Sequence, residues 1–205
     1  MTKRISAKKK ISRKIGATLW GQGNDPFLKK NYRPGQHGLM PKGRLTDYGH
    51  QLKEKQKLKF YYGNISEKQF YNLFVLASKS KGDVAENFVA LLESRLDAVI
   101  YRANFVPTVF AARQFVSHKH VTVNGKVVNI ASYRVKVGDL IQVREKSRNL
   151  AIVIDSLQRM VRDVPVYLQL DKDSFGVKFV SKPAFAEVPY PAEMHPNLIK
   201  EFYSR

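Results

Sequence analysis

The spacing of apolar residues predicts helices over much of residues 45–117. A first helix is expected from Asp47 to about Tyr62, because Thr46 offers an N-cap and Gly63 stands where a C-terminal glycine belongs. Similar capping patterns, including a capping box and a hydrophobic staple at the start of the second segment, predict further helices over residues 66–82, 83–102 and 109–117.

The 83–102 segment carries one apolar stripe at helical spacing, from Phe88 to Ile100. Arg95 and Arg102 stand seven residues apart, so both are expected on one basic face away from that stripe. The alternative is that Arg95 only pairs with a neighbouring acid, Asp97 or Glu93. In the 109–117 helix the residues expected to be buried are Ala112, Phe115 and Val116.

The pattern changes to strand alternation after residue 119. Residues 120–123 alternate, and Asn124-Gly125 is the strongest short signal for a hairpin with a type I′ turn. A second β segment is expected over Arg134–Val143, with a turn at Gly138-Asp139. Further along the chain we expect a short helix around 156–161, strands near 166–170 and 176–180, and a last helix from Asn197 to about Tyr203. The predicted fold class is therefore α+β, with short helices packed on a small antiparallel sheet.

The first 44 residues contain nine glycines and prolines, too many for a helix of any length. They predict an extended basic arm without an apolar core of its own. The predicted domains are the arm (1–44), an α-helical domain (45–93) completed by residues 183–205, and an α+β module (94–182) whose core is 94–157.

The formal net charge is +19, and residues 1–60 hold 16 of the 36 Lys and Arg against three acids. Along a polyphosphate each such residue releases a condensed counterion, so nucleic acid is favoured as the main partner. Three alternatives are an ordinary solvated surface, a basic membrane-surface helix and an organelle transit peptide. Hydrophobic residues make up 43% of the chain, enough for a folded core.

Candidate catalytic and metal chemistry is sparse. The chain has no cysteine, its five histidines lack zinc-site spacing, and its carboxylates fall mainly at caps and turns. Gly38 and Gly43 fit part of a phosphate-binding loop, but Arg44-Leu45 replaces the Lys-Ser/Thr that it requires. The longest apolar runs are far too short to cross a bilayer. We therefore expect a soluble protein that is not an enzyme, has no metal and no cofactor, and does not contact a membrane.

The run SRLDAVIYRANFVPTVFAARQFVSHKHVTVNGKVVNIASYRVKVGDLIQVREKSR (94–148) resembles the RNA-binding module named after small ribosomal subunit protein number four. RPGQHG (33–38), LTDYGHQLKEKQKLKFYYG (45–63) and EFYSR (201–205) are similar to that ribosomal protein family itself. Two departures stand out: the arm lacks the zinc-binding cysteines of many relatives, and TVFAARQ (108–114) replaces the frequent TRAEARQ.

The helix at 109–117 presents Arg113, Gln114 and Ser117 opposite its buried face, and we expect Lys126 to leave the hairpin turn beside Lys119. Guanidinium forks suit phosphates, and small polar groups suit 2′-hydroxyls. Together with the resemblance, these features give the expected rRNA-binding residues: Lys8, Lys9, Lys10, Arg13, Arg33, Gln36, His37, Lys42, Arg44, Tyr48, Gln51, Lys55, Lys59, Arg95, Arg102, Arg113, Gln114, Ser117, His118, Lys119, Lys126 and Arg134.

The resemblance implies a structural constituent of a bacterial-type small ribosomal subunit in the cytoplasm. It implies early binding to the 5′ domain of small-subunit (16S) rRNA, nucleation of assembly, and contact with small-subunit protein number five at a surface that affects decoding accuracy. Some relatives also bind messenger RNA where it enters the ribosome. Two other classes share the module: an RNA-modifying enzyme, for which the residues after 145 are too few, and a free RNA chaperone or rescue factor, which would lack the RPGQHG and EFYSR segments.

Overall fold

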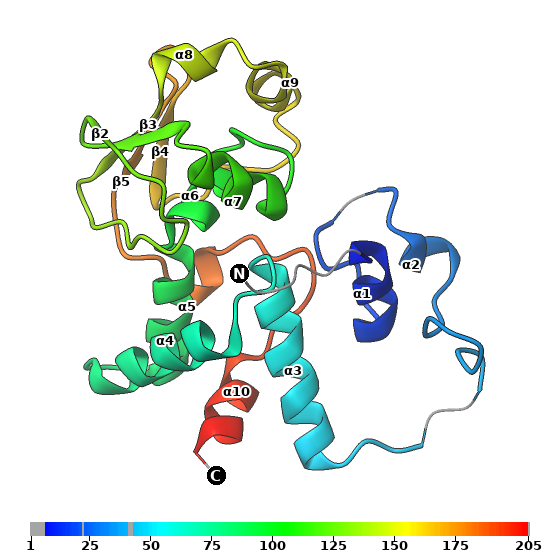
Figure 1. Cartoon of the computed structure of the whole chain (residues 1–205). Helices are drawn as coiled ribbons and strands as arrows, with labels where there is room; N and C mark the ends of the chain where they lie inside the picture. Colours follow the sequence, from blue (N-terminus) through cyan, green and yellow to red (C-terminus); the bar gives the residue numbers. More distant parts are fainter. Residues whose placement is uncertain (1–6, 22, 41–42, 205) are drawn as a thin grey trace. The chain divides into compact units, whose positions relative to one another are not determined.

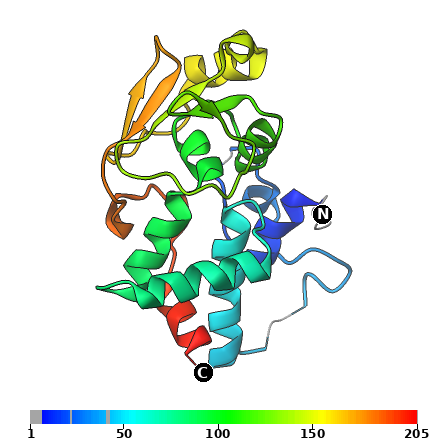
Figure 2. The same ribbon diagram turned by 60° about the vertical axis from the view of Figure 1, so that its left-hand side comes forward.

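The computed structural model describes residues 7–21, 23–40 and 43–204. The chain forms two compact units, Met1–Ala85 with Tyr190–Arg205, and Glu86–Pro189. Both are drawn in Figures 1 and 2. Whereas the sequence suggested divisions after residues 93 and 182, the units meet at 85/86 and 189/190, and the arm belongs to the first unit.

The first unit is helical and contains the following elements: α1 (Lys8–Ile15), α2 (Pro26–Lys29), α3 (Asp47–Tyr61), α4 (Glu67–Lys79) and α10 (Pro196–Tyr203). The predicted N-caps are confirmed. Thr46 Oγ1 accepts a 3.3 Å hydrogen bond from the Gly49 amide, and Ser66 Oγ accepts one of 3.4 Å from Gln69. Because such caps satisfy amides within one turn, they fix where α3 and α4 begin.

Helix α10 packs along α3, as both ribbon views show (Figures 1 and 2). Ile199 is buried, and the ring centroids of Phe202 and Tyr48 lie 5.5 Å apart. Pro196 occupies the first helical turn, where a missing amide hydrogen costs nothing. Residues 196–203 thus complete the apolar side of a helix formed nearly 150 residues earlier in the chain.

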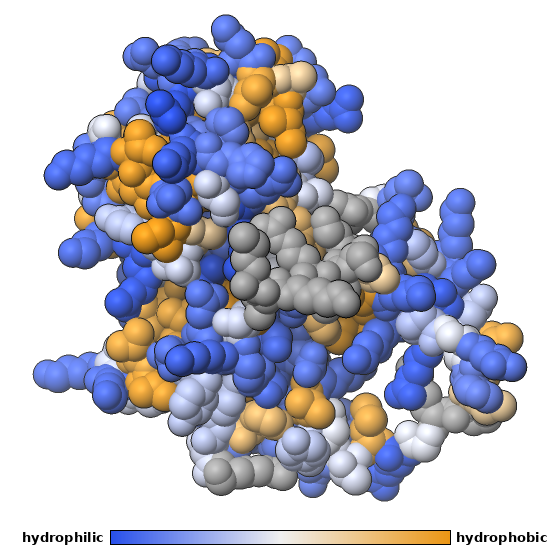
Figure 3. Space-filling view, viewed as in Figure 1, coloured by the Kyte–Doolittle hydropathy of each residue, from blue (hydrophilic) through white to orange (hydrophobic). Residues whose placement is uncertain are grey.

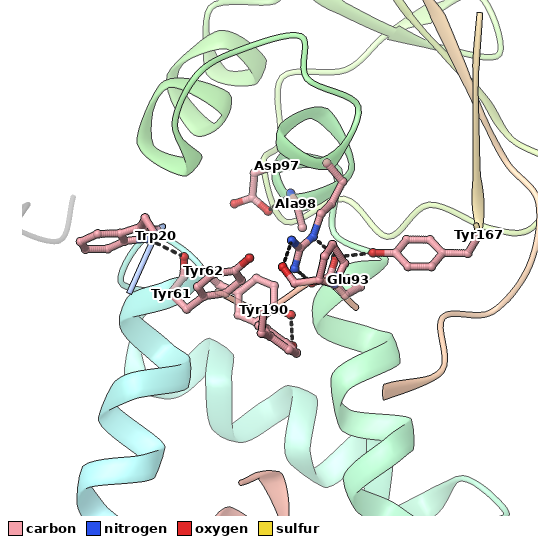
Figure 4. A network of polar contacts seen from close by, with 10 residues as sticks. Trp20, Tyr61, Tyr62, Glu93, Asp97, Ala98, Tyr167 and Tyr190 are labelled. Carbon is pink, nitrogen blue, oxygen red and sulfur yellow. Dashed lines mark hydrogen bonds and ion pairs between the residues drawn. The ribbon is translucent and has the colours of Figure 1, made fainter. Parts of the chain in front are cut away.

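The prediction that the arm holds no helix and no apolar core is wrong. Helix α1 packs against α2 and α3, and Ile11, Ile15 and Leu19 are buried. These three residues repeat every four positions and so form one apolar side. The indole Nε1 of Trp20 donates a 3.2 Å hydrogen bond to the Tyr61 carbonyl (Figure 4). Gly16 ends the helix in a left-handed conformation instead of preventing it.

The second unit combines short helices with a sheet, so the predicted α+β class is confirmed. Its described elements are α5 (Val84–Glu93, which begins at the division between the units), α6 (Leu96–Arg102), α7 (Val109–Ser117), β1 (Val121–Val123), β2 (Lys126–Val127), β3 (Leu140–Val143), α8 (Glu145–Arg148), α9 (Ala151–Arg159), β4 (Leu168–Asp171), β5 (Gly176–Phe179) and a 3₁₀ turn at Phe185–Glu187. The strands are antiparallel and lie in the order β2-β1-β3-β5-β4.

The type I′ hairpin at Asn124-Gly125 is confirmed, because both residues have positive φ, 50° and 77°. Asn124 also accepts a 2.9 Å hydrogen bond from the Leu140 amide and donates one of 2.8 Å to Asp139. The second β segment is shorter than expected, since only residues 140–143 form a strand and the residues around Gly138 turn.

The predicted 83–102 helix is broken at Ser94 and Arg95. Arg95 has extended backbone angles, and its backbone pairs with Arg134 in an antiparallel bridge. The Val135 amide donates a 2.8 Å hydrogen bond to the Ser94 carbonyl. This pairing satisfies backbone groups that a continuous helix would have satisfied internally. The break rotates α6 relative to α5, so spacing along one helix no longer relates Arg95 to Arg102.

Arg95 and Arg102 are buried, each 2% exposed, and the prediction that they form an exposed basic face is wrong. Arg95 makes a two-pronged pair with Asp97, with N–O distances of 3.0 and 2.8 Å, which is the alternative considered from the sequence. Arg102 pairs in the same way with Glu93, at 3.0 and 2.7 Å. Glu93 also accepts a 2.8 Å hydrogen bond from Tyr167 (Figure 4). Buried charges require such complete pairing.

Candidate RNA-binding surface

Helix α7 presents a polar side to solvent while Ala112, Phe115 and Val116 are buried as predicted. Thr108 caps the helix by accepting a 3.1 Å hydrogen bond from the Ala111 amide. On the opposite side Arg113 is half-buried and Gln114 exposed, and they are followed by the exposed Ser117, His118 and Lys119. The buried stripe therefore holds these polar groups in a fixed orientation.

The hairpin does not place Lys126 beside Lys119, contrary to expectation. Lys126 pairs with Val123 next to the turn, whereas Lys119 precedes the other end of β1. Lys119 has a left-handed backbone (φ 65°), and its carbonyl accepts a 3.0 Å hydrogen bond from Arg144 Nη1. Within the described residues, the side chains of Lys119, Lys126 and Arg134 make no hydrogen bond or ion pair, so their charges face solvent.

His120 connects the end of α7 to the segment after β3. Its ring stacks on Phe115 with centroids 4.8 Å apart, and its Nδ1 lies 2.8 Å from Ser147 Oγ. Burial, together with the positive charges of His118 and Arg144, lowers the pKa of His120. The ring therefore serves as a neutral packing element at physiological pH, and the cations around it supply the charge of this surface.

In the first unit the RPGQHG segment forms a tight loop. The Gly38 amide donates a 3.1 Å hydrogen bond to the Gly35 carbonyl, and a Cβ at Gly38 would lie 1.9 Å from the Arg33 carbonyl oxygen. Only glycine fits at that position. The loop leaves Arg33, Gln36 and His37 exposed, and Lys9, Lys10, Arg44 and Tyr48 are exposed elsewhere in the unit.

Four residues of the predicted set in the first unit have structural partners instead. Gln51 and Lys55 are buried: Gln51 Nε2 donates to Glu201 at 2.9 Å, and Lys55 Nζ lies 2.8 Å from Glu67. Lys59 also pairs with Glu67, at 3.1 Å. Arg13 donates to the carbonyls of Tyr32 and Arg33, both at 3.1 Å. Lys42 and the side chain of Lys8 lie outside the described residues.

The structure adds three cations that were absent from the predicted set. Arg144, Lys146 and Arg148 line a depression with Thr122, Gln142, Val143 and Glu145. The run REKSR (144–148) was part of the resemblance, but charge alternation in a short loop gave no sign that its cations gather on one side. In the space-filling view, hydrophilic residues cover much of the visible surface of the second unit, with apolar residues in smaller patches (Figure 3).

Two searches for other kinds of site had negative results for the described part of the chain. No group of three or more His, Cys, Asp or Glu side chains there could hold a metal ion. No helix within it is long and apolar enough to cross a membrane.

The comparisons with known proteins cover the whole chain. Residues 3–93 match the family described as Ribosomal protein S4/S9 N-terminal domain, and residues 94–141 match the S4 domain. Three relatives, each called Small ribosomal subunit protein uS4, come from Azorhizobium caulinodans (57% identical), Paracoccus denitrificans (56%) and Caulobacter vibrioides (56%). Each alignment covers 100% of both chains. With an S4 domain and this identity over its full length, the chain belongs to the uS4 family of small ribosomal subunit proteins.

Proposed function

We propose that this chain is a structural component of the small ribosomal subunit and binds its rRNA without catalysing a reaction. The relatives carry the name of a small-subunit protein, and the S4 domain is an RNA-binding module. The single observation that carries the proposal is full-length identity of 56–57% to proteins of that name. The exposed cations of both units agree with it, because a net charge of +19 needs a polyanionic partner.

The RNA-binding side chains are those that the structure leaves exposed and available. In the second unit these are Gln114, Ser117, His118, Lys119, Lys126 and Arg134, with Arg113 at their edge. In the first unit they are Lys9, Lys10, Arg33, Gln36, His37, Arg44 and Tyr48. Phosphate contacts from such residues position the RNA, and the amide and hydroxyl groups are suited to 2′-hydroxyls and unpaired bases.

The resemblance supports a finer assignment. The RNA site is the 5′ domain of the small-subunit rRNA, and binding there starts assembly of the subunit body in a cytoplasmic ribosome of bacterial type. Small-subunit protein number five is the expected protein neighbour, and their contact influences decoding accuracy. Messenger RNA is a further partner where it enters the ribosome.

Salt dependence of binding tests the proposal. With roughly 6 to 10 phosphates neutralised, the logarithm of the association constant should fall against the logarithm of salt with a slope of about −5 to −9. The measurement uses the full chain and a 5′-domain rRNA transcript. A slope shallower than about −2 contradicts the electrostatic account. Failure to sediment in equal ratio with small subunits contradicts the structural role and favours a free RNA chaperone.

A further inference from the structure

A basic depression lies on the solvent-facing side of the sheet, where β3 runs into α8. It has a volume of about 290 Å³ and is lined by Thr122, Gln142, Val143, Arg144, Glu145, Lys146 and Arg148. None of these residues belongs to the RNA-contact set proposed above. Three cations and one carboxylate leave the depression with a surplus of positive charge.

Strand alternation explains which groups form its floor. Thr122 is paired with Gln142, and their neighbours Val121, Val123, Ile141 and Val143 are buried on the other side of the sheet. Thr122 and Gln142 therefore point outward and supply a hydroxyl and an amide. Gly176 is paired with Gln142, and a Cβ at Gly176 would lie 3.3 Å from Gln142 Cγ. The glycine lets the Gln142 side chain lie against the sheet.

The backbone holds the two arginines of the depression in place. Arg148 Nε donates a 3.3 Å hydrogen bond to the Val143 carbonyl, and its guanidinium carbon lies 5.6 Å from the centre of the Phe175 ring. Arg144 uses Nη1 to bond the Lys119 carbonyl. Both guanidinium groups keep further N–H donors that bond no other described residue, and Lys146 has no partner among the described residues. Pre-positioned donors of this kind are suited to an anion.

The contact between Arg144 and Lys119 joins the depression to the proposed RNA surface. Lys119 ends the polar side of α7, and the next cation across its carbonyl is Arg144, at the rim of the depression. A nucleic-acid strand that follows the positive charge beyond Lys119 therefore reaches this depression. A strand carries a phosphate at every nucleotide, so consecutive cations along one path are used together.

We propose that the depression holds a backbone phosphate of the same RNA strand that contacts Lys119, with Lys146, Arg144 and Arg148 as its donors. The assignment rests on the proposed function and extends it to a site on the outer side of the sheet. Glu145, at the rim, opposes the anion and so weakens the site.

Two substitutions of opposite charge test the proposal in the full chain, with a 5′-domain rRNA transcript as the probe. Lys146→Gln should weaken binding about fivefold and make the salt slope shallower by about 0.7 to 0.9, the contribution of one phosphate. Glu145→Gln should tighten binding about twofold, a change that damage to the fold cannot imitate. The matched control is Arg159→Gln, an equal loss of charge at an exposed position outside the depression, for which we expect less than about a twofold effect.

A second measurement locates the RNA directly. Because the chain has no cysteine, Lys146→Cys creates a single attachment point for an iron chelate that generates hydroxyl radicals. We expect strong cleavage of the transcript at one short stretch, and weaker or displaced cleavage from the control Arg159→Cys.

The results separate the two proposals. If wild type lacks tight, salt-dependent binding to the transcript, the proposed function fails. If wild type binds as expected but Lys146→Gln and Glu145→Gln both behave like Arg159→Gln, or tethered iron at residue 146 gives no cleavage, the phosphate site is wrong and the proposed function stands.

Discussion

At the scale of single residues, arginine has two separate uses in this chain. Arg95 and Arg102 lie inside the second unit, where each is bound by both oxygens of one carboxylate. Arg134 is exposed and has no side-chain partner among the described residues. Since a buried guanidinium cannot reach RNA, the two groups should respond to substitution in opposite ways.

Arg102→Gln should lower the free energy of unfolding by about 3 to 5 kcal/mol, because it leaves Glu93 ionised and without its partner inside the protein. Urea denaturation followed by circular dichroism measures the change. Unaltered stability combined with lost RNA affinity would mean that Arg102 contacts RNA after all.

Lys119→Asn should weaken RNA binding by about 1.5 to 3 kcal/mol and leave the thermal midpoint almost unchanged. Asparagine is the informative replacement because Lys119 has φ 65°, a region that asparagine tolerates better than alanine does. Filter binding at fixed salt gives the affinity. A large fall in thermal midpoint without a change in affinity would contradict the assignment.

At the scale of elements, short contacts between helices and turns decide local stability. Glu67, in the first turn of α4, accepts hydrogen bonds from Lys55 and Lys59 of α3 and from Tyr203 of α10. One carboxylate thus joins three helices. In the second unit, the side chain of Asn124 joins the hairpin turn to the next turn at Asp139.

Glu67 should make stability depend on pH. Partial burial opposes its ionisation, but hydrogen bonds from Lys55, Tyr203 and Lys59 outweigh that effect and lower the pKa of Glu67 to about 2. Because the folded pKa lies below the unfolded value of about 4.3, the stabilisation is complete above that value and is lost as pH falls towards 2. Thermal midpoints measured between pH 5 and pH 2 should therefore fall more steeply for wild type than for Glu67→Gln. Parallel curves would contradict the coupling.

Gly125→Val should destabilise the second unit by about 1 to 3 kcal/mol. No heavy atom outside the turn lies within 4 Å of a Cβ built at Gly125, so the cost comes from forcing a β-branched residue to φ 77°. Gly125→Asn, which tolerates positive φ, is the control and should lose much less. Equal thermal unfolding of Gly125→Val and wild type would show that the turn carries no strain.

At the scale of the whole molecule, charge and folding overlap in the N-terminal segment. Residues 1–44 contain 12 Lys and Arg and one acid, yet Ile11, Ile15 and Leu19 are buried in the first unit. The segment therefore contributes both positive charge for RNA and apolar contacts for α3.

Deletion of residues 1–44 should make the salt slope of RNA binding shallower and also lower stability by at least about 2 kcal/mol through lost aliphatic burial. Salt titration and urea denaturation of the truncated chain measure the two effects. The triple variant Lys9→Gln, Lys10→Gln, Arg33→Gln is the control, because it removes exposed charge and should leave unfolding unchanged. Full stability of the truncated chain would contradict the packing of α1.

The sequence predicts best those features that depend on neighbouring residues. The caps at Thr46 and Thr108 and the Asn124-Gly125 turn are local, and all three occur as expected. The break at Arg95 was missed because no proline or glycine marks it, and pairing with the distant Arg134 backbone causes it. The gathering of Arg144, Lys146 and Arg148 also depends on how strands and turns fold together, so residue spacing alone did not reveal it.

The division of the chain has a consequence for how it folds during synthesis. All residues of the second unit, Glu86–Pro189, leave the translating ribosome before Tyr190 and α10, which complete the first unit. Until then α3 exposes the apolar side that α10 later covers. Because domains generally fold as units while the chain is made, the second unit matures first although its sequence begins later. A nascent chain stopped between residues 189 and 196 would hold a folded RNA-binding module and an open helical unit vulnerable to proteases.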